Sequence, residues 1–392
     1  MYVTKPLSLY RESPNSLSLP PPEGPNTGYL VIQDEESVET CCFGLCKDPK
    51  IREFPFPQNR MLTVKYEEEY GDSSWEKCFH VYFIPVLNQP LSSNKYYVIK
   101  ARRKHKGEAY TSSTEENMIN CCFCKCVKDV KTRALDHQDP YQQFEITHMQ
   151  HCCTKGYVAK SVAPDGFPPY FLRRREGWEI STSTPLQPPL GEANGLNESF
   201  RAQLPKFDFP LSSKTSEHLV IGKWYCPFMF VKEEVKFERS LMFYDMTLEQ
   251  KWEKIYECDN DLSKNNAVML DLPVQTEVAL LFGKEAVNDD SDVVDGVMWF
   301  RSLTNTKGKG SSVGLSLAII ERMKWEQERL CWMGGQQKQV RIERVEEFGE
   351  KNGWKKYACY ILVERFSLTR MDGSLLLTYE YRHTHQLHSK WE

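Results

Sequence analysis

The stretch WKKYACYILVERFSLTR, from Trp354 to Arg370, and the stretch LLLTYEYRHTH, from Leu375 to His385, decide the fold. Both are rich in aromatic, aliphatic and β-branched residues, a composition that favours strands. Asp372-Gly373 stands between them, and Asp-Gly between two apolar runs is a strong signal for a β-hairpin. The sequence therefore predicts one long hairpin that turns at Gly373, a residue that adopts positive φ without strain.

Side chains alternate between the two faces of a strand, so Tyr379 and Tyr381 share one face of this hairpin. We expect the tyrosines to pack against the arm from Tyr360 to Phe366. The run from Val340 to Val345 precedes the hairpin, and together the three runs predict a C-terminal antiparallel β-meander. Glu364 lies on the same strand face as apolar residues, so that face is not cleanly compatible with lipid.

The rest of the second half is less uniform. Residues 219–231 have the composition of a strand, whereas Thr247 to Glu257 places apolar residues at helical spacing and predicts a helix. Residues 268–282 predict two strands that meet at a bend at Pro273. Residues 315–330 carry apolar residues on one helical face, although a strand also fits this segment.

The first half predicts a second β-rich part. Its short apolar and aromatic runs are bounded by Gly, Pro, Asn and Ser, and they cover residues 28–33, 61–66, 78–86 and 96–101. The fold class expected is mainly β (α+β), with two β-rich domains and a few short helices. The expected divisions are an extended N-terminal arm (1–25), a Cys-rich β-rich domain (26–180), a Pro/Ser-rich linker (181–217) and a β-rich C-terminal domain (218–392).

Bulk composition limits the possible classes of protein. The 392 residues carry a net charge of -4 and are 40% hydrophobic, which is typical of globular domains and gives no global reason to expect nucleic acid. No run of eighteen apolar residues and no signal-peptide pattern occurs. We therefore expect a cytoplasmic or nuclear protein that is not secreted. We also expect its 14 cysteines to be thiols or metal ligands.

Two groups of residues are candidate metal ligands. The first group contains Cys122, Cys124, Cys126, His148, Cys152 and Cys153, and the second contains His383 and His385. Zinc needs four such ligands in a tetrahedron, but the usual paired C-x-x-C spacing is absent. Small apolar thiols packed in a core and a polar terminal strand explain the same residues. We therefore expect no cofactor, with zinc as the alternative.

Several charged stretches have a plain alternative explanation. The basic runs at 100–106 and 173–175 have charges that bind phosphate groups, but no nucleic-acid motif accompanies them, which favours solvated surface. The acidic run 288–292 does not fit the calcium-loop pattern. The Gly/Lys-rich run 307–312 lacks the phosphate-loop spacing.

Longer phrases carry a family resemblance. They include PPPEGP at 20–25, GYLVIQDEE at 28–36, DPYQQFEI at 139–146, VAKSVAPDGFPP at 158–169, GKWYCPFMFVKEE at 222–234, MTLEQKWE at 246–253, ERMKWE at 321–326 and THQLHSKWE at the end. Together they resemble a plant-specific family known as domain of unknown function twelve sixty-two. The resemblance implies a flowering-plant source and one conserved architecture. It carries over no catalytic residues.

No catalytic motif is present, so we expect a non-enzymatic binding or regulatory protein, and enzymatic activity has no motif in its support. The expected partner is a protein rather than nucleic acid, with anionic lipid as a lesser alternative. Two other functions stay open: a membrane-acting, pore-former-like β protein, motivated by the long hairpin, and an enzyme with a Cys/His metal site.

Overall fold

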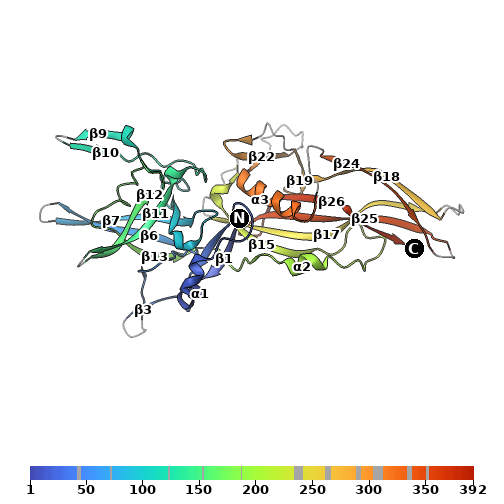
Figure 1. Ribbon diagram of the computed structural model, residues 1–392, viewed down its shortest axis with the longest axis horizontal. Helices are drawn as coiled ribbons and strands as arrows, with labels where there is room; N and C mark the ends of the chain where they lie inside the picture. The colour runs from blue at the N-terminus through green and yellow to red at the C-terminus, as the bar shows by residue number, and fades with distance from the viewer. Residues whose placement is uncertain are drawn as a thin grey trace. The chain divides into compact units, whose positions relative to one another are not determined.

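The computed structural model describes residues 1–41, 46–70, 73–121, 124–151, 154–186, 188–233, 242–260, 266–287, 293–302, 312–332, 338–349 and 353–392. The chain divides into two compact units, unit 1 (Met1–Glu192) and unit 2 (Ala193–Glu392). Long antiparallel strands dominate both units, and the helices are few and short (Figure 1). The expected mainly β class is confirmed.

Unit 1 is built on a seven-stranded sheet with the order β12-β11-β8-β7-β6-β13-β5. In chain order its strands are β5 (Lys50–Ile51), β6 (Arg60–Tyr70), β7 (Ser73–Pro85), β8 (Lys95–Lys100), β11 (Gln143–His151), β12 (Thr154–Ser161) and β13 (Glu179–Pro185). Two small ribbons accompany the sheet, β3 (Thr40–Cys41) with β4 (Cys46–Lys47) and β9 (Met118–Cys121) with β10 (Cys124–Val127). Three single turns of 3-10 helix lie between the strands: η2 (Leu91–Ser93), η3 (Glu115–Asn117) and η4 (Pro140–Gln142).

The core of unit 1 is aromatic. The ring of Phe56 lies 5.0 Å from that of Phe83 and 5.3 Å from that of Tyr96, and Trp178 stacks on Phe83. All four side chains are almost fully buried. Offset and edge-to-face ring pairs at such distances stabilise a core beyond the burial of area alone.

The first 25 residues are not an extended arm, so that prediction is wrong. Strand β1 (Tyr2–Pro6) pairs in parallel with β2 (Gly28–Ile32), and helix α1 (Leu7–Glu12) and the 3-10 turn η1 (Pro14–Ser18) lie between them. Leu7 and Tyr10, spaced three apart on α1, are buried in one cluster with Val31. The Ser- and Pro-rich composition of this segment predicted an extended chain, although Leu7 and Tyr10 have the spacing of one helix face.

Unit 2 contains a large sheet with the order β16-β23-β22-β20-β19-β26-β25-β17-β15, in which β14 also pairs with β15 and β21 with β22. Its strands are β14 (Gly195–Leu196), β15 (Leu219–Pro227), β16 (Val231–Glu233), β17 (Phe243–Asp259), β19 (Glu277–Leu281), β20 (Lys284–Val287), β21 (Val293–Val294), β22 (Val297–Ser302), β23 (Ser312–Ser316), β25 (Lys356–Arg370) and β26 (Leu375–Trp391). The helices of unit 2 are α2 (Glu198–Gln203), the 3-10 turn η5 (Phe228–Phe230) and α3 (Leu317–Glu328).

The predicted C-terminal hairpin is confirmed. Strands β25 and β26 pair antiparallel from Leu368↔Leu377 to Tyr357↔Trp391, and Gly373 has φ +84° at the turn. Tyr381 lies edge-on to Phe366, with ring centroids 6.1 Å apart. Strand β25 lies between β17 and β26 (Figure 1) and is buried along almost its whole length.

The helix predicted for Thr247 to Glu257 is wrong, because this segment forms the middle of strand β17. Leu248 and Trp252 are four residues apart, a spacing that fits a strand face as well as a helix face. In the structure Leu248 pairs with Phe366 on β25, and β15 pairs with the other edge of β17. Pairing on both edges outweighs the local helical pattern.

Two other predictions need correction. Strand β18 (Ala267–Gln275) continues through Pro273, so the break between the two expected strands falls at Thr276. Strand β24 (Gln339–Glu347), expected next to the hairpin in a meander, pairs instead with β18 along its whole length, as a separate ribbon. Apolar side chains of this ribbon, including Val274 and Ile342, pack on Ile361 of β25, which explains its place.

The helical interpretation of residues 315–330 is confirmed for Leu317–Glu328, which forms α3. Residues 181–217, expected as a linker, contain the end of β13, the whole of β14 and helix α2. The boundary between the two units lies within this stretch.

Candidate functional site

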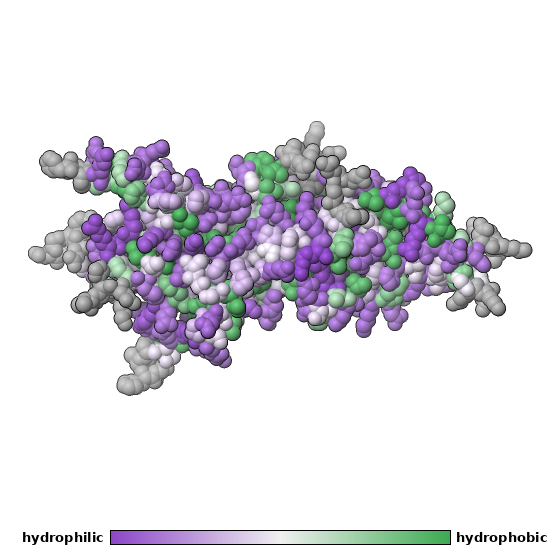
Figure 2. Space-filling view, viewed as in Figure 1, coloured by the Kyte–Doolittle hydropathy of each residue, from purple (hydrophilic) through white to green (hydrophobic). Residues whose placement is uncertain are grey.

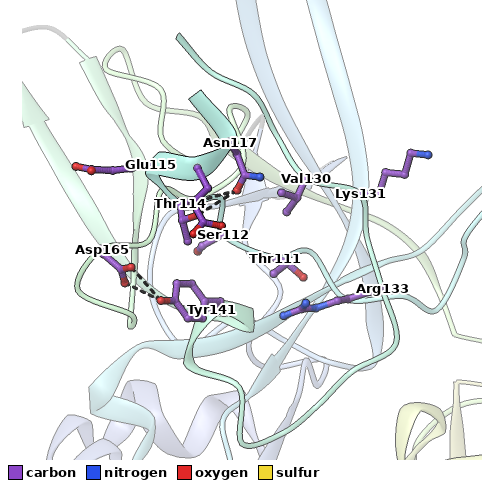
Figure 3. Close-up of a pocket in the computed structure, with 11 residues that line it drawn as sticks. Thr111, Ser112, Thr114, Glu115, Asn117, Val130, Lys131, Arg133, Tyr141 and Asp165 are labelled. Carbon is purple, nitrogen blue, oxygen red and sulfur yellow. Dashed lines mark hydrogen bonds between the residues drawn. The ribbon is translucent and has the colours of Figure 1, made fainter. Parts of the chain in front are cut away.

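An open pocket of about 670 Å³ lies in unit 1 (Figure 3). It is built by η3, η4 and the segments around them, and its lining residues are Thr111, Ser112, Thr114, Glu115, Glu116, Asn117, Val130, Lys131, Arg133, Tyr141 and Asp165. Its volume is within the range of ordinary small-molecule sites. Sequence patterns did not reveal it, because the lining comes from several separate segments that share no motif.

Backbone hydrogen bonds hold the walls of the pocket together. The amide of Ser112 donates to the carbonyl of Tyr141 at 2.7 Å, and the amide of Ser113 donates to the carbonyl of Phe167 at 2.8 Å. The amide of Thr114 donates to the side-chain oxygen of Asn117 at 2.9 Å, as part of a capping box. Cross-links between the segments make this a preformed pocket rather than a loose gap between loops.

Hydroxyl groups form one part of the lining. The Tyr141 hydroxyl donates to both oxygens of Asp165, at 2.9 and 3.0 Å, and this bond raises the pKa of Tyr141. Ser112 donates to the hydroxyl of Ser161 at 2.8 Å. Neither histidine nor cysteine occurs among the lining residues that the structure describes. The pocket thus presents neutral hydroxyls beside the carboxylates of Glu115, Glu116 and Asp165.

The charged side chains of the pocket lie on opposite sides. Figure 3 shows Glu115 and Asp165 on one side and Lys131 and Arg133 on the other. Arg133 is already paired with Asp139. Within the described ranges, neither Glu115 nor Lys131 has an ion-pair partner. The pocket therefore has one acidic and one basic side, each with charge left uncompensated.

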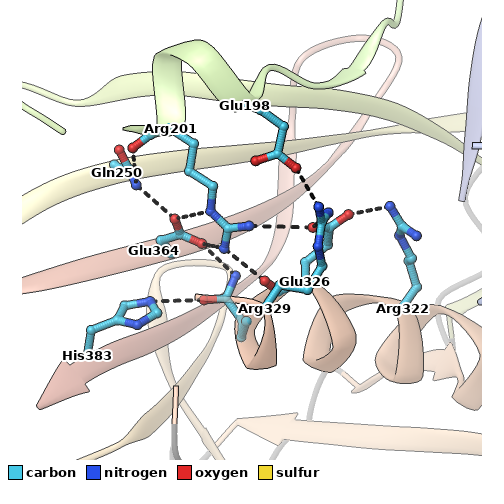
Figure 4. Close-up of polar contacts among 9 residues, drawn as sticks. Glu198, Arg201, Gln250, Arg322, Glu326, Arg329, Glu364 and His383 are labelled. Carbon is cyan, nitrogen blue, oxygen red and sulfur yellow. Dashed lines mark hydrogen bonds and ion pairs between the residues drawn. The ribbon is translucent and has the colours of Figure 1, made fainter. Parts of the chain in front are cut away.

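A second polar cluster is buried in unit 2 (Figure 4). The carboxylate of Glu364, on β25, accepts bonds from Nε and Nη2 of Arg201 at 2.9 and 2.7 Å. It also accepts bonds from the side-chain amides of Gln250 and Gln327 at 2.9 and 2.8 Å. Glu364 has no exposed surface, so four donors replace its lost hydration.

The same cluster continues along α3. Arg201 donates to the carbonyl of Glu326 at 2.8 Å, and the Glu326 carboxylate is paired with Arg322 and Arg329. Burial raises the pKa of Glu326 although three arginines face it. This cluster joins α2, β25 and α3 and is enclosed by protein, so we interpret it as structural.

His383 belongs to this buried cluster. Its Nε2 lies 3.1 Å from the Gln327 side-chain oxygen, and burial lowers its pKa to about 3, with smaller contributions from His385 and Arg201. His385 is exposed, and the two rings lie edge to face. The expectation that His383 and His385 bind a metal stays a prediction.

Most of the cysteine candidates lie outside the described residues. Cys122, Cys152, Cys153 and the side chain of Cys124 lie outside the part of the chain that the structure describes. His148 packs its ring 4.9 Å from Phe54 and 5.0 Å from Tyr157, and Cys126 lies half-buried on β10. Among described residues, no three or more His, Cys, Asp or Glu side chains are arranged to hold a metal.

The two basic runs, 100–106 and 173–175, differ in the contacts of their side chains. Arg174 lies over the ring of Tyr66 at 4.6 Å and pairs with Glu176 at 3.0 Å, so its charge is satisfied within unit 1. The side chains of Arg102, Arg103 and Lys104 are exposed. The acidic run 288–292 and residues 307–311 lie outside the described ranges.

One sequence signal pointed towards the buried cluster. Glu364 interrupts an otherwise apolar strand face, and a carboxylate in that position needs a buried partner. The partner, Arg201, lies in the stretch assigned to the linker. Asn197, which caps α2 by accepting the amide of Phe200 at 3.1 Å, is the local signal for that helix.

Comparisons with known proteins give no function. The model of a family described as "Protein of unknown function (DUF1262)" matches residues 23–123. No curated protein matches. A solved structure titled "Crystal structure of Cry35Ab1" is similar at a TM-score of 0.46 and 9% identity, over 86% of this chain and 90% of that chain. None of the helices in the described ranges is both long and apolar enough to cross a membrane.

Proposed function

We propose that this is a non-enzymatic binding protein and that the pocket of unit 1 binds a small dipolar ligand, one that carries both an ammonium and a carboxylate group. The observation that carries the proposal is the separation of charge across the pocket. Glu115 and Asp165 are complementary to an ammonium group, and Lys131 is complementary to a carboxylate. Amino acids and short peptides have this chemistry.

Three features support binding over catalysis. The hydrogen-bonded walls keep the pocket open without a ligand, which lowers the ordering cost of binding. The hydroxyls of Thr111, Ser112 and Tyr141 supply neutral polar contacts that orient a ligand. The Tyr141 hydroxyl keeps its proton, because its hydrogen bond to the Asp165 carboxylate raises the pKa of Tyr141. A short peptide also agrees with the expectation of a protein partner.

The experiment is a thermal-shift screen of the full chain with peptides that differ only in their terminal charges. Free di- and tripeptides should raise the melting temperature in a concentration-dependent way. Their N-acetylated and C-amidated analogues, each lacking one charge, should raise it far less. Equal stabilisation by all three forms, or by none, would overturn the proposal.

Two variants assign the binding to the pocket. Lys131→Ala and Glu115→Ala should each weaken the affinity for the free peptide by about tenfold, because each removes one of the two complementary charges. Lys125→Ala is the matched control, since Lys125 is exposed on β10 and does not line the pocket. An equal loss in all three variants would indicate a nonspecific charge effect.

We also propose that the protein acts in a reducing compartment, the cytoplasm or the nucleus. Cys78 is an exposed thiol and Cys226 and Cys359 are buried thiols, none of them in a disulfide, as is typical of proteins kept reduced. Imaging of a fluorescent fusion tests this, and an extracellular signal would contradict it.

The buried position of strand β25 gives no support to the membrane-acting alternative. Strand β25 is covered on both faces and contains the fully buried Glu364. On the face of the molecule shown in Figure 2, hydrophobic residues are scattered among hydrophilic ones.

A further inference from the structure

A tight basic turn follows strand β8 of unit 1. The amide of Gly107 donates to the carbonyl of Lys100 at 2.8 Å, and the amide of Lys106 donates to the carbonyl of Arg103 at 3.1 Å. Arg103 and His105 both have φ +67°, a conformation that is uncommon for residues other than glycine. The turn therefore has a defined backbone that displays its cations from fixed positions.

Arg102, Arg103 and Lys104, at the tip of this turn, have no acidic partner among the described residues. The carboxylate of Glu108, at the base of the turn, is bound to His105 at 2.8 Å and to Thr132 at 2.7 Å. Over the described ranges, no carboxylate lies within ion-pair distance of Arg102, Arg103 or Lys104. Solvated surface charge in this protein is otherwise commonly paired, as Lys50 is with Glu179 at 2.9 Å.

His80, on the adjacent strand β7, adds a further nitrogen to this surface. The amide of Ala101 donates to the His80 carbonyl at 3.0 Å, which places the start of the turn against β7. The Nδ1 atom of His80 lies 3.1 Å from the Thr63 hydroxyl, which orients the ring. Desolvation, and then Arg102 and Arg103, lower the pKa of His80, so both guanidinium groups act on the imidazole.

Nearby negative charge does not offset this potential. Glu76, which is four residues from His80 on the same face of β7, is paired with Lys65 at 3.1 Å. The potential at the turn is therefore positive, localised and uncompensated, although the whole chain has a net charge of -4.

We propose that Arg102, Arg103 and His80 form an anion site that binds a single phosphate group, carried by a small molecule or by a lipid headgroup. Guanidinium groups offer paired donors that match phosphate oxygens, and a compact dianion compensates two adjacent cations at once. The small extent of the turn fits one phosphate group better than a nucleic-acid backbone, which needs a row of contacts along its length. The site is separate from the pocket of unit 1, whose lining includes none of these residues.

His80 provides a local readout of binding. The pKa of its imidazole is measured by NMR in the full chain, with and without saturating inorganic phosphate. A bound dianion stabilises the protonated imidazole, so the pKa of His80 should rise towards and above its ordinary value. An unchanged pKa of His80 would overturn the proposal.

Variants separate the site from general surface charge. Arg102→Gln combined with Arg103→Gln should weaken phosphate binding at least tenfold and abolish the phosphate-induced rise, whereas Arg175→Gln on the other basic run should leave both unchanged. Melting temperatures check that the variants fold, which is expected because both arginines are exposed. An equal response in the double variant and in Arg175→Gln would contradict the site.

The source of the phosphate is determined by comparing probes. Binding to inorganic phosphate alone indicates a small-molecule site. Binding to phosphatidylcholine vesicles only when they contain phosphatidic acid, in competition with free phosphate, indicates a lipid headgroup at the same site. Stronger binding to a single-stranded oligonucleotide than to either, with a steep salt dependence, would replace the proposal with a nucleic-acid surface.

Discussion

The change Glu364→Gln tests the structural role assigned to the buried cluster of unit 2. Glutamine has nearly the same shape but no charge, and it replaces one acceptor oxygen with a donor group. The carboxylate of Glu364 now accepts four bonds of 2.7 to 2.9 Å. In the variant Arg201 keeps Glu326 as its acidic partner among the described residues, at 3.5 Å.

The expected cost follows from the burial of both partners. Arg201 is 4% exposed and Glu364 is 0% exposed, and removing one partner of a buried pair costs about 3–5 kcal/mol. We expect Glu364→Gln to lower the free energy of unfolding of unit 2 by that amount. The double variant Arg201→Met/Glu364→Met should lose less, because no charge stays buried without a partner.

Urea denaturation of the full chain, followed by circular dichroism and tryptophan fluorescence, measures these losses. Glu179→Gln is the matched control, because the Lys50–Glu179 pair has the same 2.9 Å separation but is more than half exposed. That control should cost less than about 1 kcal/mol. If Glu364→Gln cost no more than the control, or if the double variant cost more than the single one, the electrostatic reasoning would be refuted.

Three further changes have defined outcomes. Gly373→Val should destabilise unit 2 by about 1–2 kcal/mol, because valine at φ +84° is strained; an unchanged melting temperature would count against the turn. The pKa of His383 is about 3 in the folded chain and about 6.5 in the unfolded chain. The contribution of neutral His383 to the free energy of unfolding is therefore complete above about pH 6.5 and is lost as the pH falls towards 3. Melting curves from pH 7.5 to 5 should show a smaller decline for His383→Gln than for the unchanged protein. A fragment 193–392 should fold, whereas 218–392 should not, since Pro205 and Leu211 accept bonds from Trp252 and Tyr360; circular dichroism of both fragments checks this.

Local signals were sufficient for the elements that lie next to each other along the chain. Asp372-Gly373 between two apolar runs specified the turn and the pairing of β25 with β26, because a hairpin depends on neighbouring residues alone. The helix α3 was likewise visible from its own periodicity.

Long-range pairing was not visible. The spacing of Leu248 and Trp252 fits both a helix and a strand, and only the partners β15 and β25 decide between them. Strand β24 contacts β18, more than sixty positions earlier in the chain, rather than its neighbour β25. No local pattern records such a choice.

The candidate pocket was beyond the reach of sequence patterns for a similar reason. Its residues are ordinary polar ones, without the spacing of any catalytic or metal motif. They form a pocket only when η3, η4 and the segment at Val130 come together in the folded chain. The buried cluster of unit 2 differs, because the charge of Glu364 within an apolar strand is a local signal of a buried partner.

The most direct test of the central proposal is hydrogen-exchange mass spectrometry of the full chain, free and saturated with the most strongly stabilising free peptide. A ligand in the pocket should slow exchange in residues 111–117, 130–133 and 139–142, which build its walls, and leave the exchange of unit 2 unchanged. Protection that appears only elsewhere in the chain, or none at saturation, would contradict the assignment of this pocket as the binding site.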